Sequence, residues 1–149
     1  MAELREYLPS DFDRLWELDQ ACFSPEIAYS RAELEYYLRS PHAICLLALE
    51  SGKTVGFILG HSRGRQPHVG RIITLDVAPE ARRAGIGSIL MQNLEACFRQ
   101  AGCRSTLLEV AVNNHAALRF YKRHGYAVLR TLRRYYPGGL DGLLLGKAI

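Results

Sequence analysis

The spacing of hydrophobic residues changes along the chain, and each change predicts a new element of secondary structure. Short apolar runs bounded by glycine, proline or polar residues predict seven strands, at residues 4–8, 43–49, 54–61, 72–77, 105–112, 126–132 and 140–148. Apolar residues at three- and four-residue steps predict four helices, at residues 11–23, 31–40, 86–101 and 115–123. The resulting order, βααβββαβαββ, indicates a mixed α/β protein, and a length of 149 residues indicates one domain over residues 1–149.

Polar residues before the first two helices indicate how those helices begin. Ser10 or Asp11 is expected to cap the first helix. Ser30 and Glu33 have the spacing of a capping box at the second. The strands on either side of the helix at 86–101 are expected to run parallel, because such a crossover connects parallel strands.

The segment before the helix at 86–101 carries two glycines and two arginines, in the order Arg82-Arg83-Ala84-Gly85-Ile86-Gly87. The first N–H groups of a helix have no partner within it and the helix dipole is positive there, while glycine lets an anion approach the backbone closely. The segment therefore predicts a pyrophosphate cradle, with an ordinary helix start as the alternative. A Walker loop would need lysine where Ser88 stands, and a dinucleotide fingerprint would need a small residue in place of Leu90.

From this segment onwards the chain resembles the GNAT family of N-acetyltransferases. The resemblance is carried by Arg82-x-x-Gly85-x-Gly87 after an apolar strand, and then by residues 107–110, Asn114, 117–121 and 124–126 in the family's order and spacing. It covers about the last half of the chain, and the first half matches mainly in its order of elements. The resemblance implies a mixed sheet of about seven strands with about four helices, in which two parallel central strands splay apart.

The same resemblance implies acetyl-CoA as the cosubstrate, with its pantetheine between the splayed strands. The residues expected to bind it are Leu75, Asp76, Val77, Arg82, Arg83, Ala84, Gly85, Ile86, Gly87, Ser88 and Asn114. Asn114 is also placed to cap the helix at 115–123, and the two roles are compatible.

Two residues are candidates for the chemistry. Glu109 is a carboxylate within an apolar strand, where a charge is costly unless it is paired, solvent-facing or functional. The resemblance favours a general base that acts directly or through a water. Tyr121 lies one helical turn after Leu118, which fits core packing, whereas the resemblance implies that it protonates the leaving thiolate. The expected reaction is direct transfer, in which backbone N–H near Val77 stabilises the oxyanion.

The end of the chain bears on the acceptor. Residues 133–137, Arg-Arg-Tyr-Tyr-Pro, followed by Asp141, resemble the ribosomal-protein-alanine branch of the family, in which tyrosines here hold a peptide N-terminus. Tyr135 and Tyr136 are therefore expected to bind the α-amine end of a protein, in particular a ribosomal one. That branch usually has methionine near Leu145, which is a departure in the peptide pocket. The alternatives are an acetyltransferase for a small amine or antibiotic, a non-catalytic acyl-CoA sensor and a basic RNA-binding module.

Composition limits the partners. A net charge of +4 and a pI of about 9.0 suit an anionic cofactor, but the chain has no RNA-binding motif, so no direct nucleic-acid contact is expected. The five histidines lack ligand spacing and the four cysteines form no Cys-x-x-Cys pair, which predicts no metal site. No apolar run approaches the ~20 residues of a membrane span, and the first residues do not resemble a secretory signal. We expect a soluble cytoplasmic protein without membrane contact, either a monomer or a weak dimer.

Overall fold

A computed structural model describes residues 2–149, and its elements follow the predicted order. The strands are β1 (Glu3–Glu6), β2 (Ala43–Glu50), β3 (Lys53–His61), β4 (Val69–Val77), β5 (Ser105–Ala111), β6 (Ala127–Leu132) and β7 (Gly142–Ala148). The helices are α1 (Phe12–Cys22), α2 (Arg31–Leu38), α3 (Ile86–Gln100) and α4 (His115–Arg123). All seven strands form one sheet in the order β1-β2-β3-β4-β5-β7-β6, so the predicted mixed α/β fold is confirmed.

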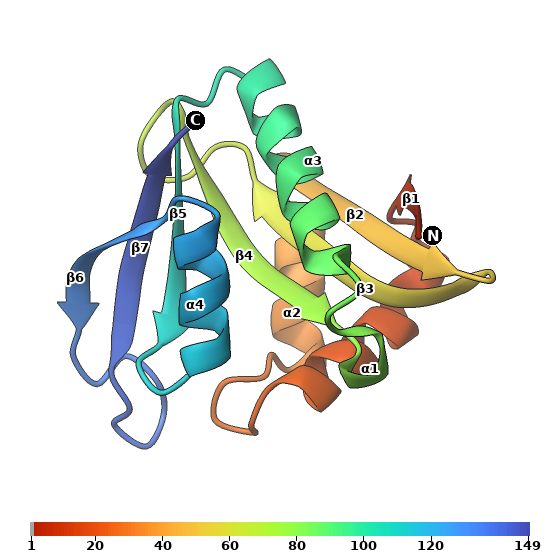
Figure 1. The fold of residues 1–149 in the computed structure, drawn as a ribbon, viewed down its shortest axis with the longest axis horizontal. Coiled ribbons are helices and arrows are strands. Elements are labelled where there is room, and N and C mark those ends of the chain that lie inside the picture. The colour runs from red at the N-terminus through yellow and green to blue at the C-terminus, as the bar shows by residue number, and fades with distance from the viewer. Residues whose placement is uncertain (1) are drawn as a thin grey trace.

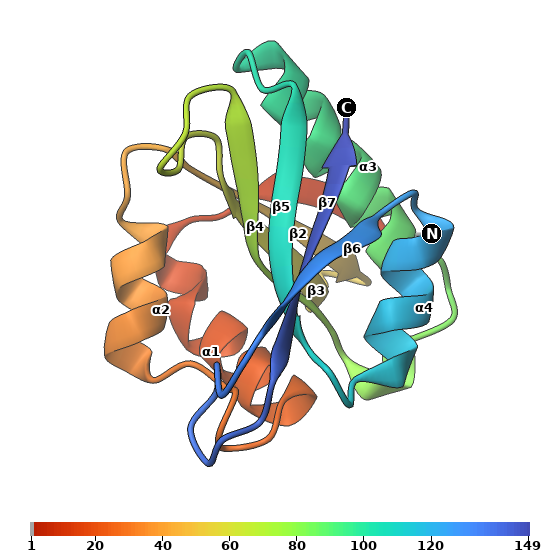
Figure 2. The ribbon, with the colours of Figure 1, turned by 90° about the vertical axis from the view of Figure 1, so that its left-hand side faces the viewer.

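The helices cover both faces of the sheet. In Figures 1 and 2, α1 and α2 lie on one face, and α3 and α4 on the other. Helix α3 packs against the sheet through a buried stripe, which consists mainly of Ile86, Leu90, Met91, Leu94 and Phe98. Phe98 lies directly on the sheet backbone, because a Cβ at Gly70 would come within 2.5 Å of its ring. The apolar periodicity of the sequence is therefore the core-facing side of this helix.

The middle of the sheet is joined only over a short distance. Strands β4 and β5 are parallel and pair at Val69 with Ser105, Gly70 with Thr106 and Arg71 with Leu107. Beyond these three pairs the two strands diverge, as Figure 1 shows. Every other neighbouring pair in the sheet is antiparallel. The predicted splay of two parallel central strands is thus present, and it divides the sheet into a β1–β4 part and a β5–β7–β6 part.

An irregularity in β4 lies at the beginning of the splay. On β3, Leu59 faces Thr74 whereas the next residue, Gly60, faces Ile72. Ile73 is therefore an extra residue, a β-bulge that bends the strand locally. The bulge lies two residues after Arg71, the last residue of β4 that pairs with β5.

The predictions for the first two helix starts had different outcomes. Ser30 and Glu33 form the expected capping box of α2, with Glu33 N–H donating to Ser30 Oγ at 3.1 Å. The prediction for α1 was wrong, because Asp11 is helical and makes no cap to this helix. Its carboxylate instead accepts the Leu8 N–H and pairs with Arg5, so it closes the short 3₁₀ turn at Pro9–Asp11. Over residues 2–149, none of the helices is long and apolar enough to cross a bilayer.

Candidate active site

The start of α3 offers several unpaired backbone donors. Gly85 is the residue before the helix and has a φ of +78°, a left-handed conformation that glycine adopts without strain. Within residues 2–149, the N–H groups of Ile86, Gly87 and Ser88 have no backbone carbonyl partner, as expected in a first helical turn. A Cβ at Gly85 would have no atom within 4 Å, so this side of the segment is open. The segment therefore fits a pyrophosphate that accepts these N–H groups.

The side chains around this segment have different roles. Ile86 is buried against the sheet, so only its backbone can reach a ligand. The Arg82 Nε donates to the Val77 carbonyl at 3.1 Å, while Arg83 and Ala84 are exposed. The Ser88 hydroxyl lies 2.9 Å from His124 Nε2, at the end of α4. This contact joins the anion-binding segment to α4.

Beyond Arg71, successive residues of β4 direct their backbone N–H and C=O groups in turn to β3 and to the splay. The Ala78 N–H donates to Val55 on β3, so by antiparallel alternation Asp76 also faces β3, whereas Leu75 and Val77 turn their backbone groups to the splay. The Val77 carbonyl accepts from Arg82 and from the Cys22 thiol, at 3.1 and 3.3 Å. Leu75 and Val77 are therefore brought to the predicted cofactor side. Asp76 is not, because its side chain is fully buried and bonded to Thr74.

Glu109 lies at the splay and is held by three donors. Its Oε1 accepts Arg71 Nε at 3.0 Å, and its Oε2 accepts Arg71 Nη2 at 2.7 Å and the Tyr135 hydroxyl at 2.5 Å. The Glu109 side chain is 15% exposed and that of Arg71 is 39% exposed. The structure therefore brings Glu109 and Tyr135 together, and the ion pair that the sequence left open is present. Leu108 and Val110 lie opposite Leu145 and Leu143, which face α4. Glu109, between them in β5, therefore faces the α1–α2 side.

The two tyrosines of the β6–β7 connection pack edge to face. Their ring centroids are 5.0 Å apart with planes at 86°. A Cβ at Gly142 would lie 3.2 Å from the Tyr135 ring and 3.3 Å from the Tyr136 ring, so a glycine at the start of β7 lets both rings approach. Burial raises the pKa of Tyr136 to about 12. Burial and the hydrogen bond to Glu109 raise the pKa of Tyr135 as well, so both phenols are neutral donors at pH 7.

Tyr121 lies on α4, on the other side of the sheet from Glu109. It is 8% exposed, and its hydroxyl has no hydrogen-bond partner within residues 2–149. Burial raises its pKa, which keeps the phenol protonated. Asn114 begins the same helix, and its Oδ1 accepts the Ala117 N–H at 3.2 Å, so the predicted cap is confirmed.

Three residues of the site were missed in the sequence. Arg71 is a charged residue in a mainly apolar strand, a signal similar to the one that singled out Glu109, but its partner is 38 residues away. Tyr29 follows α1 and its hydroxyl donates to the Ile73 carbonyl at the bulge, at 3.3 Å. Cys22 reaches the splay from the end of α1. Burial raises the pKa of its thiol to about 11, so this cysteine is a neutral thiol and a weak nucleophile at pH 7.

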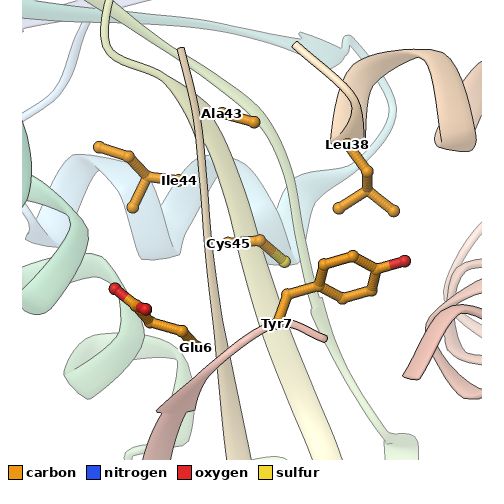
Figure 3. Close-up of a pocket in the computed structure, with 6 residues that line it drawn as sticks. All are labelled: Glu6, Tyr7, Leu38, Ala43, Ile44 and Cys45. Atoms are coloured by element: carbon orange, nitrogen blue, oxygen red, sulfur yellow. The ribbon is translucent and has the colours of Figure 1, made fainter. Parts of the chain in front are cut away.

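Two surface hollows lie elsewhere. One, of about 290 Å³, is at the outer edge of the sheet between β1, β2 and α2. Figure 3 shows Tyr7, Cys45 and Leu38 on one side of β2, and Glu6 and Ile44 on the other, so its polar groups do not converge. The other, of about 420 Å³, is apolar and lies between α4, β6 and β7. Neither is lined by Arg71, Glu109 or Tyr135.

Comparison with known proteins agrees with this geometry. Residues 12–126 match the model of the Acetyltransferase (GNAT) family. An uncharacterised N-acetyltransferase of Methanocaldococcus jannaschii is 34% identical over 97% of this chain and 90% of its own length. An N-alpha-acetyltransferase of Sulfurisphaera tokodaii is 30% identical over 89% of this chain and 87% of its own. The crystal structure of the Escherichia coli ribosomal-protein-S18-alanine N-acetyltransferase superposes with a TM-score of 0.87, at 20% identity and over 100% and 94% of the two chains.

The chain therefore belongs to the GNAT acetyltransferase family. It is an N-acetyltransferase that uses acetyl-CoA, so the predicted cosubstrate and enzyme class are confirmed. The likeness to the ribosomal-protein-alanine enzyme, at 20% identity, is one of fold. The acceptor amine is a separate question, which depends on the α1–α2 side of the splay.

Proposed function

We propose that this enzyme acetylates the α-amine of protein N-termini. The observation that carries the proposal is the hydrogen bond from Tyr135 to Glu109, which brings the β6–β7 connection to the splay. An amphipathic tyrosine pair there offers an apolar wall with hydroxyl donors, which suits an extended peptide. A relative that is 30% identical over 87% of its length is an N-alpha-acetyltransferase, which supports this acceptor.

Glu109 is proposed to accept the proton of the amine, directly or through a water. A carboxylate has about four lone-pair positions, and three on Glu109 are taken. Because Oε2 accepts twice and Oε1 once, the remaining position is on Oε1. An ammonium or an ordered water bound there would be oriented towards the splay. Arg71 holds this carboxylate in one geometry, so we propose that it positions the base.

The cofactor side is proposed to consist of the α3 start and the open β4 backbone. The N–H groups of Ile86, Gly87 and Ser88 would bind the pyrophosphate, with Arg82, Arg83, Ala84 and Gly85 around it, and Leu75 and Val77 would bond the pantetheine amides. Acetyl-CoA supplies the acetyl group as a thioester. The Val77 N–H would stabilise the oxyanion, Tyr121 would return a proton to the sulfur, and Asn114 would assist from the start of α4.

The choice of an α-amine follows from its acidity. With a pKa of about 8, an α-amine is roughly a tenth neutral at pH 7, whereas a lysine of pKa ~10.4 is neutral only to about a few parts in ten thousand. A single carboxylate that Arg71 already pairs with is sufficient for the first task. Exposed arginines on β6 and after it, Arg130, Arg133 and Arg134, would favour an acidic or RNA-bound acceptor such as a ribosomal protein.

Two versions of one peptide test the proposal, one with a blocked N-terminus and a free lysine, the other with the reverse. We expect acetylation of the free N-terminus, located by mass spectrometry. Replacing Tyr135 and Tyr136 with alanine should raise the peptide KM and leave acetyl-CoA affinity unchanged, while Tyr36→Ala, an exposed tyrosine on α2, serves as the control. Preference for the lysine version, or for a small amine over both, would overturn the assignment.

Sedimentation would separate the expected monomer or weak dimer from a stable oligomer.

A further inference from the structure

A pair of acidic side chains lies in the interior, outside the machinery described above. Asp19 on α1 and Asp76 on β4 are both 0% exposed, and each has one buried carboxylate oxygen without a hydrogen-bond partner within residues 2–149. Each group influences the pKa of the other. Two interacting carboxylates in an apolar interior are not both ionised, because each raises the cost of the other's charge. The pair must therefore hold a proton.

The position of that proton follows from the unpaired oxygens. Asp19 Oδ1 and Asp76 Oδ2 have no partner in the part of the chain that the structure describes. Asp76 Oδ1 accepts the Thr74 hydroxyl, and Asp19 Oδ2 accepts the Tyr29 N–H at 2.7 Å. A proton on Asp76 Oδ2 that is donated to Asp19 Oδ1 satisfies both at once. Burial and the Asp19 charge raise the pKa of Asp76 well above its usual range, which agrees with this placement.

The acid pair connects β4 to the segment between α1 and α2. The Thr74 hydroxyl donates to Asp76 and the Tyr29 N–H donates to Asp19, so a proton shared by the two acids would complete the connection. The Tyr29 carbonyl accepts from Trp16 and Gln20, at 3.2 and 2.8 Å. The Tyr29 hydroxyl bonds the β4 bulge, so residue 29 is held at its N–H, its carbonyl and its side chain.

We propose that the singly protonated Asp19–Asp76 pair is a positioning device that holds Tyr29 and the α1–α2 segment against the splay for the acceptor. The Tyr29 hydroxyl donates to the Ile73 carbonyl, two residues after Arg71 and at the beginning of the splay, so Tyr29 lies on the acceptor side of the site. Loss of the shared proton would set two carboxylates against each other between α1 and β4. The α1–α2 segment would then loosen, and acceptor binding would weaken before cofactor binding does. That last consequence rests on the proposed function.

Other groups around the pair also titrate or carry charge. Asp76, once ionised, would act on Cys22, Cys45 and Tyr121, and the Asp19 charge acts on Tyr29. Arg82 stabilises the charged form of Asp76, and Glu33 on α2 opposes the charge on Asp19. Burial raises the pKa of Cys22, Cys45, Tyr29 and Tyr121, so these four are neutral at pH 7.

Asp76→Asn is the matched variant, because an asparagine amide donates to Asp19 and accepts from Thr74 but cannot ionise. Infrared spectroscopy should show a protonated-carboxyl C=O band in the wild-type protein that is absent from Asp76→Asn. As pH rises through the pKa of the pair, exchange of the Tyr29 amide, corrected for its intrinsic pH dependence, should quicken about tenfold or more in the wild type and stay flat in the variant. Neither readout needs a substrate.

Kinetics then test the link to function. Over the same pH range the peptide KM should rise several-fold in the wild type relative to Asp76→Asn, while the acetyl-CoA KM stays equal in the two. The α-amine of the peptide titrates in the same way with both proteins, so its effect cancels in the ratio of their KM values. Absence of the infrared band, or equal Tyr29 exchange, would overturn the proposal. Equal KM profiles together with the band would overturn the role in acceptor binding. If the peptide is not acetylated, the proposed function is wrong. The infrared band and the Tyr29 amide exchange would still test the acid pair.

Discussion

Tyr121 is 8% exposed and its hydroxyl makes no hydrogen bond within residues 2–149, so the hydroxyl is free to donate to a ligand. We expect Tyr121→Phe to lower kcat about 10²- to 10⁴-fold, the usual contribution of a positioned acid. Its acetyl-CoA affinity by calorimetry and its unfolding midpoint should stay close to the wild type. Tyr126→Phe is the control, because that hydroxyl bonds Glu95 rather than facing a ligand. Near-normal turnover in Tyr121→Phe would leave protonation of the thiolate to water.

A second residue-scale prediction concerns stability and pH. Burial raises the pKa of Asp76 in the folded protein above the unfolded value of about 3.9, so the native state binds more protons than the unfolded state between the two values. Stability from this group is therefore present below the unfolded pKa and lost as pH rises through the folded one. Urea midpoints should fall less steeply with pH in Asp76→Asn than in the wild type. Asp13→Asn, at an exposed site on α1, should follow the wild-type slope.

At the scale of elements, the start of α3 can be tested for its preference for an anion. Gly87→Asp and Gly87→Asn have the same shape, and both press on the Phe120 ring, which lies 3.2 Å from a Cβ at this position. The difference between them therefore reports charge alone. We expect the aspartate variant to bind CoA at least about tenfold more weakly than the asparagine variant, because its carboxylate opposes the pyrophosphate. Equal affinities by calorimetry would remove this segment from the cofactor site.

The elements were predictable where the signal is local. The capping box at Ser30, the glycine segment before α3 and the cap at Asn114 each depend on residues within a few positions of one another. The cap expected at Asp11 is absent, because the Asp11 carboxylate accepts from Arg5 and from the Leu8 N–H and not from the first turn of α1. Glu109 was found as a lone charge in a strand. Its partners were not, since Arg71 and Tyr135 reach it only once three strands are assembled.

At the scale of the whole molecule, Arg71 and Glu109 join the two parts of the sheet where β4 and β5 separate. We expect Arg71→Met to lower the free energy of unfolding by about 1–2 kcal/mol, since it leaves a mostly buried carboxylate with one donor and the pair is partly screened by solvent. The double variant Arg71→Met, Glu109→Met should recover part of this loss. Urea unfolding with an unchanged m-value would measure both. A cost under about 0.3 kcal/mol for Arg71→Met would show that the three backbone pairs alone hold the parts together.

The divergence of β4 from β5 also gives one strand two kinds of amide hydrogen. The N–H groups of Asp76 and Ala78 face β3 and should exchange slowly with deuterium, whereas those of Leu75 and Val77 face the splay and should exchange quickly, residue by residue along a single strand. Addition of CoA would slow the fast pair and leave the slow pair as it was. An amide-exchange spectrum of β4 would therefore record the occupancy of the splay without any measurement of catalysis.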